Sequence, residues 1–216
     1  EPPRGSMAAK TYLIVSNGLW PEEVVWKPLV QEAVHILACD GAAHQCLEHK
    51  IPIDTVIGDM DSISEEVRVK LLQQSRLQFL HQDGQENNDL VKAIIWSVDQ
   101  GATKIEIFGI EGGDIAHQFA AILALCEVPS NTRLHTTKSS IELLEKTGYR
   151  NCSIEKYTSF SLLSIGTVKG VNLTGAKWNL ANKEVRPGTQ GLHNRVESDC
   201  LEIEYTSGQL LLFLDR

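Results

Sequence analysis

Short apolar runs alternate with helical patterns through the first part of the chain, and each run ends in turn residues. The expected strands are Thr11 to Val15, Val34 to Cys39, Thr55 to Ile57, Gln78 to Leu80 and Lys104 to Phe108. The helical patterns lie near Pro28 to Ala33, after Asp40, after Ser62, after Asn88 and over Ile115 to Cys126. Strands that alternate with helices at this interval predict an α/β fold with a mostly parallel, Rossmann-like sheet and helices on both faces.

The pattern changes after about Arg133, where strand-like runs are separated by Gly, Asn, Ser and Lys and no long helical pattern follows. These runs are Leu134 to Thr136, Ile141 to Leu144, Cys152 to Ile154, Ser159 to Ile165, Val168 to Leu173, Leu201 to Tyr205 and Leu210 to Leu214. We therefore expect an α/β domain over residues 7–133 and an antiparallel β-sandwich over residues 134–216. Residues 1–6, ahead of Met7, are interpreted as a tag remnant.

The composition narrows the kind of partner that the chain can have. A net charge of -8 and a pI near 5.4 argue against nucleic acid, because nucleic-acid binders normally carry a basic face. No apolar stretch approaches the roughly 18 residues that a membrane helix needs, so no membrane association is expected. The five cysteines include no C-x-x-C pair, and we expect them to stay reduced in a cytoplasmic protein.

Acidic residues follow several of the predicted strands and point to a metal site. Asp40 follows the second strand, Asp59 and Asp61 follow the third, and Asp89 lies in the first turn of a helix capped by Asn88. Ser62 and Glu65 have the spacing of a capping box, which predicts a helix start directly after Asp61. Because the carboxyl ends of parallel strands share one edge of a sheet, these carboxylates are expected to converge there.

Carboxylates without a matching cluster of Cys or His favour Mg²⁺ over zinc or copper. Mg²⁺ held in this way usually also binds the phosphates of a substrate, which indicates phosphoryl or pyrophosphoryl transfer. The sequence contains no G-x-x-x-x-G-K-[ST] loop, so a P-loop enzyme is excluded. The competing interpretation of Asp59 and Asp61 is a solvated acidic turn, since Asp and Gly are common turn residues.

Several motifs, taken together and in order, resemble those of the thiamine pyrophosphokinase family. Residues 39–43 read Cys-Asp-Gly-Ala-Ala for the family's Ala-Asp-Gly-Gly-Ala, and residues 58–63 read Gly-Asp-Met-Asp-Ser-Ile for its Gly-Asp-Phe-Asp-Ser-Ile. Residues 85–89 resemble its Gln-Asp-x-Thr-Asp. Residues 174–180, followed by Gly188, Thr189 and Asn194, resemble its Gly-x-Lys-Trp/Tyr-x-Leu and Gly-Thr-x-x-Ser-Asn segments.

The resemblance implies transfer of the terminal diphosphate of ATP to the hydroxyl of thiamine, with release of AMP. It also implies a homodimer in which each active site lies between one chain's first domain and its partner's second domain. Asp59, Asp61 and Asp89 would hold Mg²⁺ and take part in catalysis, with Asp61 or Asp89 as the proton acceptor. The residues implied near the nucleotide are Asn17, Gly18, Asp40 and Gly41, and those implied at thiamine are Gln85, Trp178, His193 and Asn194.

Some of these residues have simpler interpretations. Trp178 could be packed in the core, Asn17 and Gly18 could form only a turn, and Gln85 could be a solvated loop residue. The chain also departs from the family where many members carry Arg and Asp, because Asp114 and Ala116 stand there. Unless Lys92, Lys138 or Arg195 supplies the lost positive charge, ATP is expected to bind more weakly or in another pose.

These departures leave three alternatives open. The chain could be a divergent enzyme acting on another hydroxyalkyl heterocycle, or a paralogue that binds thiamine or its diphosphate with little or no catalysis. It could also be a phosphatase that uses Asp59 and Asp61 as the nucleophile and acid of a haloacid-dehalogenase-like site. The phosphatase interpretation fits less well, because its signature normally follows the first strand and it leaves Lys177 and Trp178 unexplained.

Overall fold

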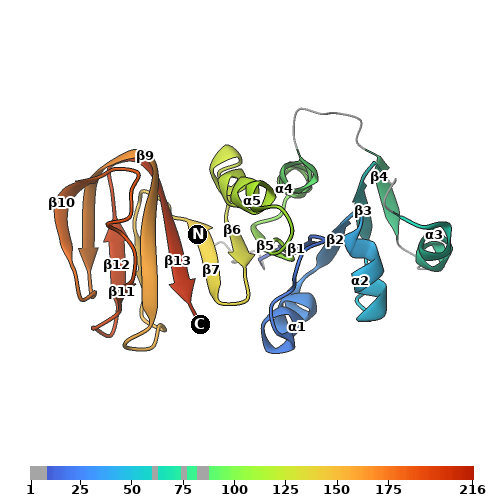
Figure 1. The fold of residues 1–216 in the computed structure, drawn as a ribbon, viewed down its shortest axis with the longest axis horizontal. Coiled ribbons are helices and arrows are strands. Elements are labelled where there is room, and N and C mark those ends of the chain that lie inside the picture. Colours follow the sequence, from blue (N-terminus) through green and yellow to red (C-terminus); the bar gives the residue numbers. More distant parts are fainter. Residues whose placement is uncertain (1–8, 60–62, 74–76, 82–87) are drawn as a thin grey trace, which may run out of the picture. The chain divides into compact units, whose positions relative to one another are not determined.

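The computed structural model describes residues 9–59, 63–73, 77–81 and 88–216. The chain divides into two compact units, Glu1–Thr132 and Arg133–Arg216 (Figure 1). The first is a mixed α/β unit with parallel strands, and the second is built from antiparallel strands. The predicted change of architecture after the first part of the chain is therefore present.

The sheet of the first unit is parallel and runs in the order β4-β3-β2-β1-β5. Its strands are β1 (Thr11–Val15), β2 (His35–Cys39), β3 (Thr55–Gly58), β4 (Gln78–His81) and β5 (Lys104–Phe108). Most residues of β1, β2, β3 and β5 are buried, as expected for strands covered on both faces. The chain order reverses between β1 and β5, which makes this the switch point of the sheet.

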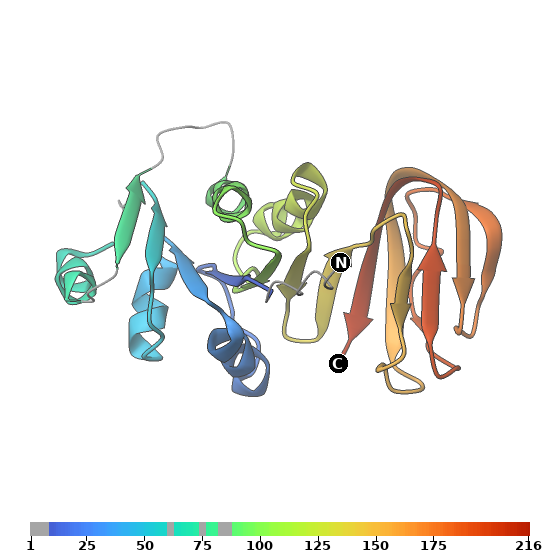
Figure 2. The same ribbon diagram turned by 180° about the vertical axis from the view of Figure 1, so that it is seen from behind.

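Helices cover both faces of this sheet, with α4 and α5 on one face and α1 and α2 on the other (Figures 1 and 2). The helices are α1 (Glu23–Glu32), α2 (Ala42–Glu48), α3 (Glu65–Leu72), α4 (Asp89–Asp99) and α5 (Ile115–Glu127). One hydrophobic core joins α1, α2 and α3 to the sheet through residues such as Leu29, Cys46 and Leu71. The helix α4 packs on β1, β2 and β3 from the opposite side.

Two helix starts differ in how well the sequence predicted them. Asn88 caps α4 as expected, because its Oδ1 accepts the N–H of Val91 at 2.9 Å. The capping box proposed for Ser62 is wrong for α3, since the helix begins at Glu65 and its cap is Ser64. The Ser64 Oγ accepts the N–H of Val67 at 3.3 Å.

The second unit is organised around β9 (Ser159–Thr174), which pairs with several strands along its length. Its first half pairs with β13 (Ser207–Asp215) and β11 (Asn194–Arg195), and its second half with β10 (Leu180–Val185) and β12 (Leu201–Glu204). The remaining strands are β6 (Thr132–His135), β7 (Ser139–Leu143) and β8 (Tyr149–Asn151). These strands pair in antiparallel fashion, and apolar side chains of the unit form a separate core.

The structure corrects the expectation that every cysteine stays reduced. Cys152 and Cys200 form a disulfide that joins the residue directly after β8 to the residue directly before β12. The proposed strand from Cys152 to Ile154 is also wrong, because β8 ends at Asn151. Cys39, Cys46 and Cys126 are free thiols.

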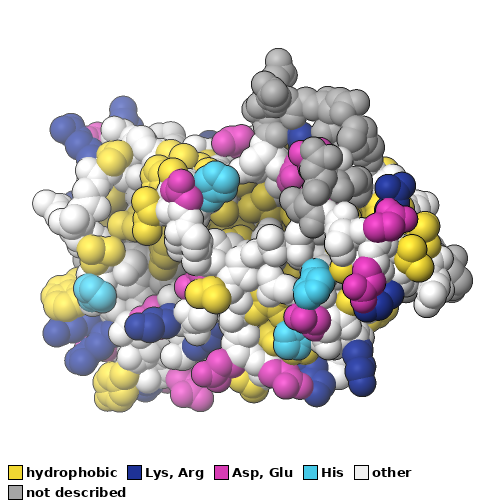
Figure 3. All heavy atoms as spheres, turned by 45° about the vertical axis from the view of Figure 1, so that its right-hand side comes forward, with side chains coloured by type: hydrophobic (Ala, Val, Ile, Leu, Met, Phe, Trp, Pro, Cys, Tyr) yellow, Lys and Arg dark blue, Asp and Glu magenta, His cyan; other side chains and the backbone are white. Residues whose placement is uncertain are grey.

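The exposed face in Figure 3 carries acidic and basic side chains that are interspersed. On the helices, ion pairs one turn apart join Lys27 to Glu23 and Lys70 to Glu66. Pairs of this exposed kind contribute little stability each. Among the described residues, no helix is long and apolar enough to cross a membrane.

Candidate active site

The loops that follow β1 and β5 meet at the carboxyl edge of the sheet. The N–H of Gly18 donates to the carbonyl of Gly109 at 2.6 Å, and the N–H of Leu19 donates to the carbonyl of Glu111 at 2.7 Å. A side chain at Gly18 would place its Cβ 2.2 Å from the Glu111 carbonyl oxygen, so only glycine fits there. The two loops therefore close the switch point with backbone bonds, and any ligand at this edge must lie over them or over β2 and β3.

Asn17 and Gly41 touch across this edge. A Cβ on Gly41 would lie 2.3 Å from the Asn17 Nδ2, and the Asn17 Oδ1 accepts a hydrogen bond from the Gln45 Nε2 at 3.2 Å. No sequence motif singles out Gln45, whose side chain holds the Asn17 amide from α2. Asn17 and Gly18 thus do more than form an isolated turn: Asn17 packs against Gly41, and Gly18 bonds to the loop after β5.

Asp40 and Asp89 converge on Gly58, the last residue of β3. A Cβ built on Gly58 would lie 2.8 Å from the Asp40 Cβ, 3.4 Å from the Asp40 Cγ and 3.4 Å from the Asp89 Oδ2. Asp40 is buried, whereas the Asp89 side chain is 40% exposed. The absence of a side chain on Gly58 therefore leaves a cradle between two carboxylates from different loops.

A positive charge also reaches this cradle. The Lys92 Nζ lies 3.4 Å from the Asp89 Oδ1, one turn further along α4, and the Lys92 side chain is only 11% exposed. Lys92 is one of the cations considered as a replacement for the missing arginine. Its ammonium lies beside a carboxylate that is expected to face the phosphates.

The other predicted acids are only partly described. Asp59 follows Gly58 directly and is exposed, whereas Asp61 and Gln85 lie outside the residues that the structure describes. Within the described ranges, no group of three or more Asp, Glu, His and Cys side chains is close enough to hold a metal ion. The donor set that is visible, two carboxylates around a glycine, fits the preference of Mg²⁺ for a few oxygen ligands.

Cys39 lies at the base of this region, where β2 ends. Burial raises the pKa of its thiol to about 12, and the Asp89 and Asp40 carboxylates add to the rise. The Ser16 Oγ lies 3.9 Å from the Cys39 Sγ. The thiol is therefore neutral at physiological pH, which excludes a role as a thiolate nucleophile.

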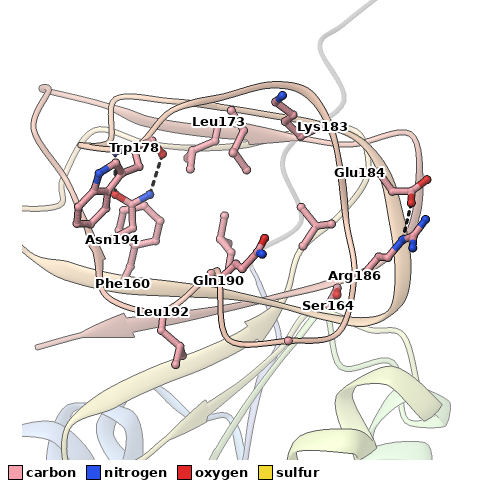
Figure 4. Close-up of a pocket in the computed structure, with 15 residues that line it drawn as sticks. Phe160, Ser164, Leu173, Trp178, Lys183, Glu184, Arg186, Gln190, Leu192 and Asn194 are labelled. Carbon is pink, nitrogen blue, oxygen red and sulfur yellow. Dashed lines mark hydrogen bonds and ion pairs between the residues drawn. The ribbon is translucent and has the colours of Figure 1, made fainter.

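Trp178 is exposed in the second unit and is not a core residue. It retains 54% exposure, and the Lys177 Nζ lies 4.3 Å from the centre of its ring. Figure 4 shows Trp178 and Asn194 at one end of a cavity of about 410 Å³, with Glu184 and Arg186 at the other end. His193 is exposed next to Asn194 and has a positive φ of 58°.

Asn194 is buried beneath Trp178 and bonds to its backbone. The Asn194 Oδ1 accepts the Trp178 N–H at 3.2 Å, and the Asn194 Nδ2 donates to the Trp178 carbonyl at 2.9 Å. Trp178 and His193 are therefore exposed, whereas the Asn194 side chain is buried and uses its amide for hydrogen bonds within the protein.

Asp114, which stands where the resemblance leads us to expect an arginine, has a structural role. Asp114 caps α5, since its Oδ1 accepts the N–H of Ala116 at 2.7 Å. Arg195 is engaged by Glu197, whose Oε1 lies 2.8 Å from its Nη2. Within the first unit, Lys92 lies beside the Asp89 carboxylate.

Comparisons with known proteins agree over both units. A family model described as "Thiamin pyrophosphokinase, catalytic domain" matches residues 26–137, and one described as "Thiamin pyrophosphokinase, vitamin B1 binding domain" matches residues 147–210. Thiamine pyrophosphokinase of Bacillus subtilis (strain 168) is 30% identical over 147 residues, which are 64% of this chain and 66% of that protein. The chain thus matches just under two thirds of that relative.

Solved structures share the fold over nearly the whole chain. A crystal structure of thiamine pyrophosphokinase from Bacillus subtilis has a TM-score of 0.82 at 23% identity and covers 95% of this chain and 99% of its own. The yeast enzyme's structure has a TM-score of 0.78 at 18% identity and covers 98% and 88%. At these identities the likeness establishes the fold.

Fold and site together define an α/β protein that gathers carboxylates at the carboxyl edge of a parallel sheet and continues into an antiparallel β unit. Both parts of this architecture match models of one family. The chain belongs to the thiamin pyrophosphokinase family.

Proposed function

We propose that this chain transfers the pyrophosphoryl group of ATP to the hydroxyl of thiamine, giving thiamine diphosphate and AMP. The observation that carries the proposal is the convergence of Asp40 and Asp89 on Gly58, in a chain whose two parts both match this family. The reaction forms a bond between the thiamine oxygen and the β-phosphorus and breaks the bond between that phosphorus and the oxygen of AMP. The hydroxyl proton passes to a carboxylate, Asp61 or Asp89.

The roles of the two units follow from this reaction. The first unit binds the nucleotide, with Asn17, Gly18 and Gly41 beside Asp40. Asp59, Asp61 and Asp89 hold Mg²⁺, which neutralises phosphate charge when it is bound. Lys92 adds a fixed positive charge where the arginine of other members is missing.

The second unit, a β-sandwich on this proposal, supplies the thiamine site. The face of Trp178 stacks on a ring of thiamine, and Gln85 and His193 are assigned to thiamine recognition on this proposal. Each site is completed across a homodimer, so that the first unit of one chain works with the second unit of its partner.

The direct test is to incubate the protein with ATP, MgCl₂ and thiamine and to measure AMP and thiamine diphosphate together. Equal amounts of the two products are expected. Asp61→Asn is expected to abolish turnover, because it removes the charge of the side chain. Since the shape of the side chain is kept, the fold should be retained, and circular dichroism checks this. Thiamine binding without AMP release would instead indicate a binding paralogue, and a trapped aspartyl-phosphate would indicate a phosphatase.

A further inference from the structure

Asn194 grips the backbone of Trp178 with both ends of its amide. The Oδ1 accepts from the Trp178 N–H and the Nδ2 donates to the Trp178 carbonyl, so both polar backbone groups of that residue are held by one side chain. Fixing these two groups also fixes the direction of the Trp178 Cα–Cβ bond. The exposed indole is therefore presented from a backbone that cannot turn freely.

Asn194 is itself held in place. It begins β11, which pairs with β9 at Phe160, and its Oδ1 also accepts the N–H of Arg195 at 2.9 Å. Both acceptor positions of the amide oxygen are thus used inside the protein. Asn194 forms part of the cavity wall, but only 9% of its surface is exposed and its amide oxygen is already used, so it has little left to offer a ligand.

The Trp178 ring offers one face to a ligand. The Lys177 ammonium lies over the ring at 4.3 Å from its centre, so a stacking partner is directed to the opposite face. A rotation of the Trp178 backbone would change which face is open. The orientation of the ring as a stacking surface therefore depends on the two hydrogen bonds from Asn194 to the Trp178 backbone.

We propose that Asn194 is a positioning residue, which acts on thiamine affinity through Trp178 and does not touch the substrate. The proposal rests on the proposed function, because it assigns the stacking partner to thiamine. It differs from the expectation that Asn194 binds substrate directly.

A double-mutant cycle tests this route. Asn194→Asp keeps the acceptor for the two N–H groups but places an oxygen against the Trp178 carbonyl. We expect the thiamine KM to rise about tenfold, the factor that follows from losing one hydrogen bond. The ATP KM and kcat are expected to change less than about twofold, since the first unit is unaltered. In a Trp178→Ala background, Asn194→Asp is expected to add nothing further.

A matched control is available in Asn172, which also bonds a backbone N–H, that of Asn182, at 2.7 Å. Asn172→Asp is expected to leave the thiamine KM unchanged. If the effects of Asn194→Asp and Trp178→Ala were additive, Asn194 would contact thiamine directly and the proposal would be overturned. An unchanged thiamine KM with a lowered melting temperature would also overturn it, because the residue would then be merely structural.

Acrylamide quenching keeps the test separate from catalysis. The difference in quenching between the wild type and Trp178→Phe isolates the signal of Trp178, and Asn194→Asp is expected to increase quenching of that component alone. Quenching can be measured whether or not the wild type releases AMP. A wild type that releases no AMP would reject the proposed function but would leave this test of Asn194 intact. Unchanged quenching would show that the hydrogen bonds from Asn194 do not fix the orientation of Trp178.

Discussion

At the scale of single residues, Gly58 sets the spacing of the acidic site. It holds a φ of +148°, and a Cβ there would lie against the Asp40 side chain. Backbone preference and close approach thus select glycine together. The Gly-Asp pair matters because the glycine makes the space that the carboxylates share.

Gly58→Ala is expected to lower turnover at least about 100-fold, by moving Asp40 away from Asp89, and to destabilise the fold by roughly 1–3 kcal/mol. Steady-state kinetics and urea unfolding measure the two effects. Gly101→Ala is the control, because Gly101 also has a positive φ but no atom within 4 Å of its Cβ position. Equal losses of turnover in both variants would show that backbone strain alone is responsible.

His35 is a second residue with a measurable signature. Its ring stacks on Tyr12 at 4.9 Å, its Nε2 lies 2.9 Å from the Thr55 Oγ1, and burial lowers its pKa. The unfolded chain therefore binds a proton at a higher pH than the folded chain, so stability falls as the pH drops below about 6.5.

His35→Gln is expected to flatten this dependence, which unfolding free energies measured between pH 5 and pH 7.5 would reveal. His117→Gln, at an exposed position, is the control and should leave the slope unchanged. A slope that persists in His35→Gln would assign the effect to another group.

At the scale of elements, the α/β unit was predicted closely and the β unit only in part. The β1 and β5 bounds agree with the sequence interpretation because buried parallel strands are continuous apolar runs. The strands β10 and β11 were missed, since β10 is largely exposed and polar and β11 has two residues. Two predicted runs are one strand, β9, which passes through Gly166 without ending.

The candidate site was likewise predictable from the sequence only in part. The position of Asp40 and Asp89 at one edge follows from strand order, which the alternation of strands and helices made predictable. The bond from Asn194 to Trp178 joins a residue of β11 to one in the loop between β9 and β10, and no local pattern encodes such a contact. The pairing of Cys152 with Cys200 is equally invisible in sequence, because cysteine spacing does not specify connectivity.

Reduction of this disulfide is expected to lower the stability of the second unit. A loop closed over 48 residues corresponds to about 4 kcal/mol in the chain-entropy account. Thermal unfolding with and without dithiothreitol measures the effect, and a Cys152→Ser/Cys200→Ser variant should be insensitive to the reductant. An unchanged melting temperature of the wild type on reduction would mean that the bond contributes no stability.

At the scale of the whole molecule, the proposed shared sites make a prediction about mixtures. In a mixed dimer of Asp89→Asn and Trp178→Ala chains, one site carries both defects and the other carries none. Random mixing makes half of the dimers mixed, so about a quarter of wild-type activity is expected at low thiamine. Refolding the two variants together and assaying AMP release tests this, with each variant refolded alone as the control. Sites contained within one chain would show no recovery.

The position of β13 has a consequence for how the protein is made. This strand lies between β7 and β9, yet a ribosome produces it after both of them. During synthesis the edges of β7 and β9 stay open until residues 207–215 have emerged, and open edges are where nascent chains aggregate. Chaperone demand should therefore last until residues 207–215 have left the ribosome, and fall once that strand is inserted between β7 and β9.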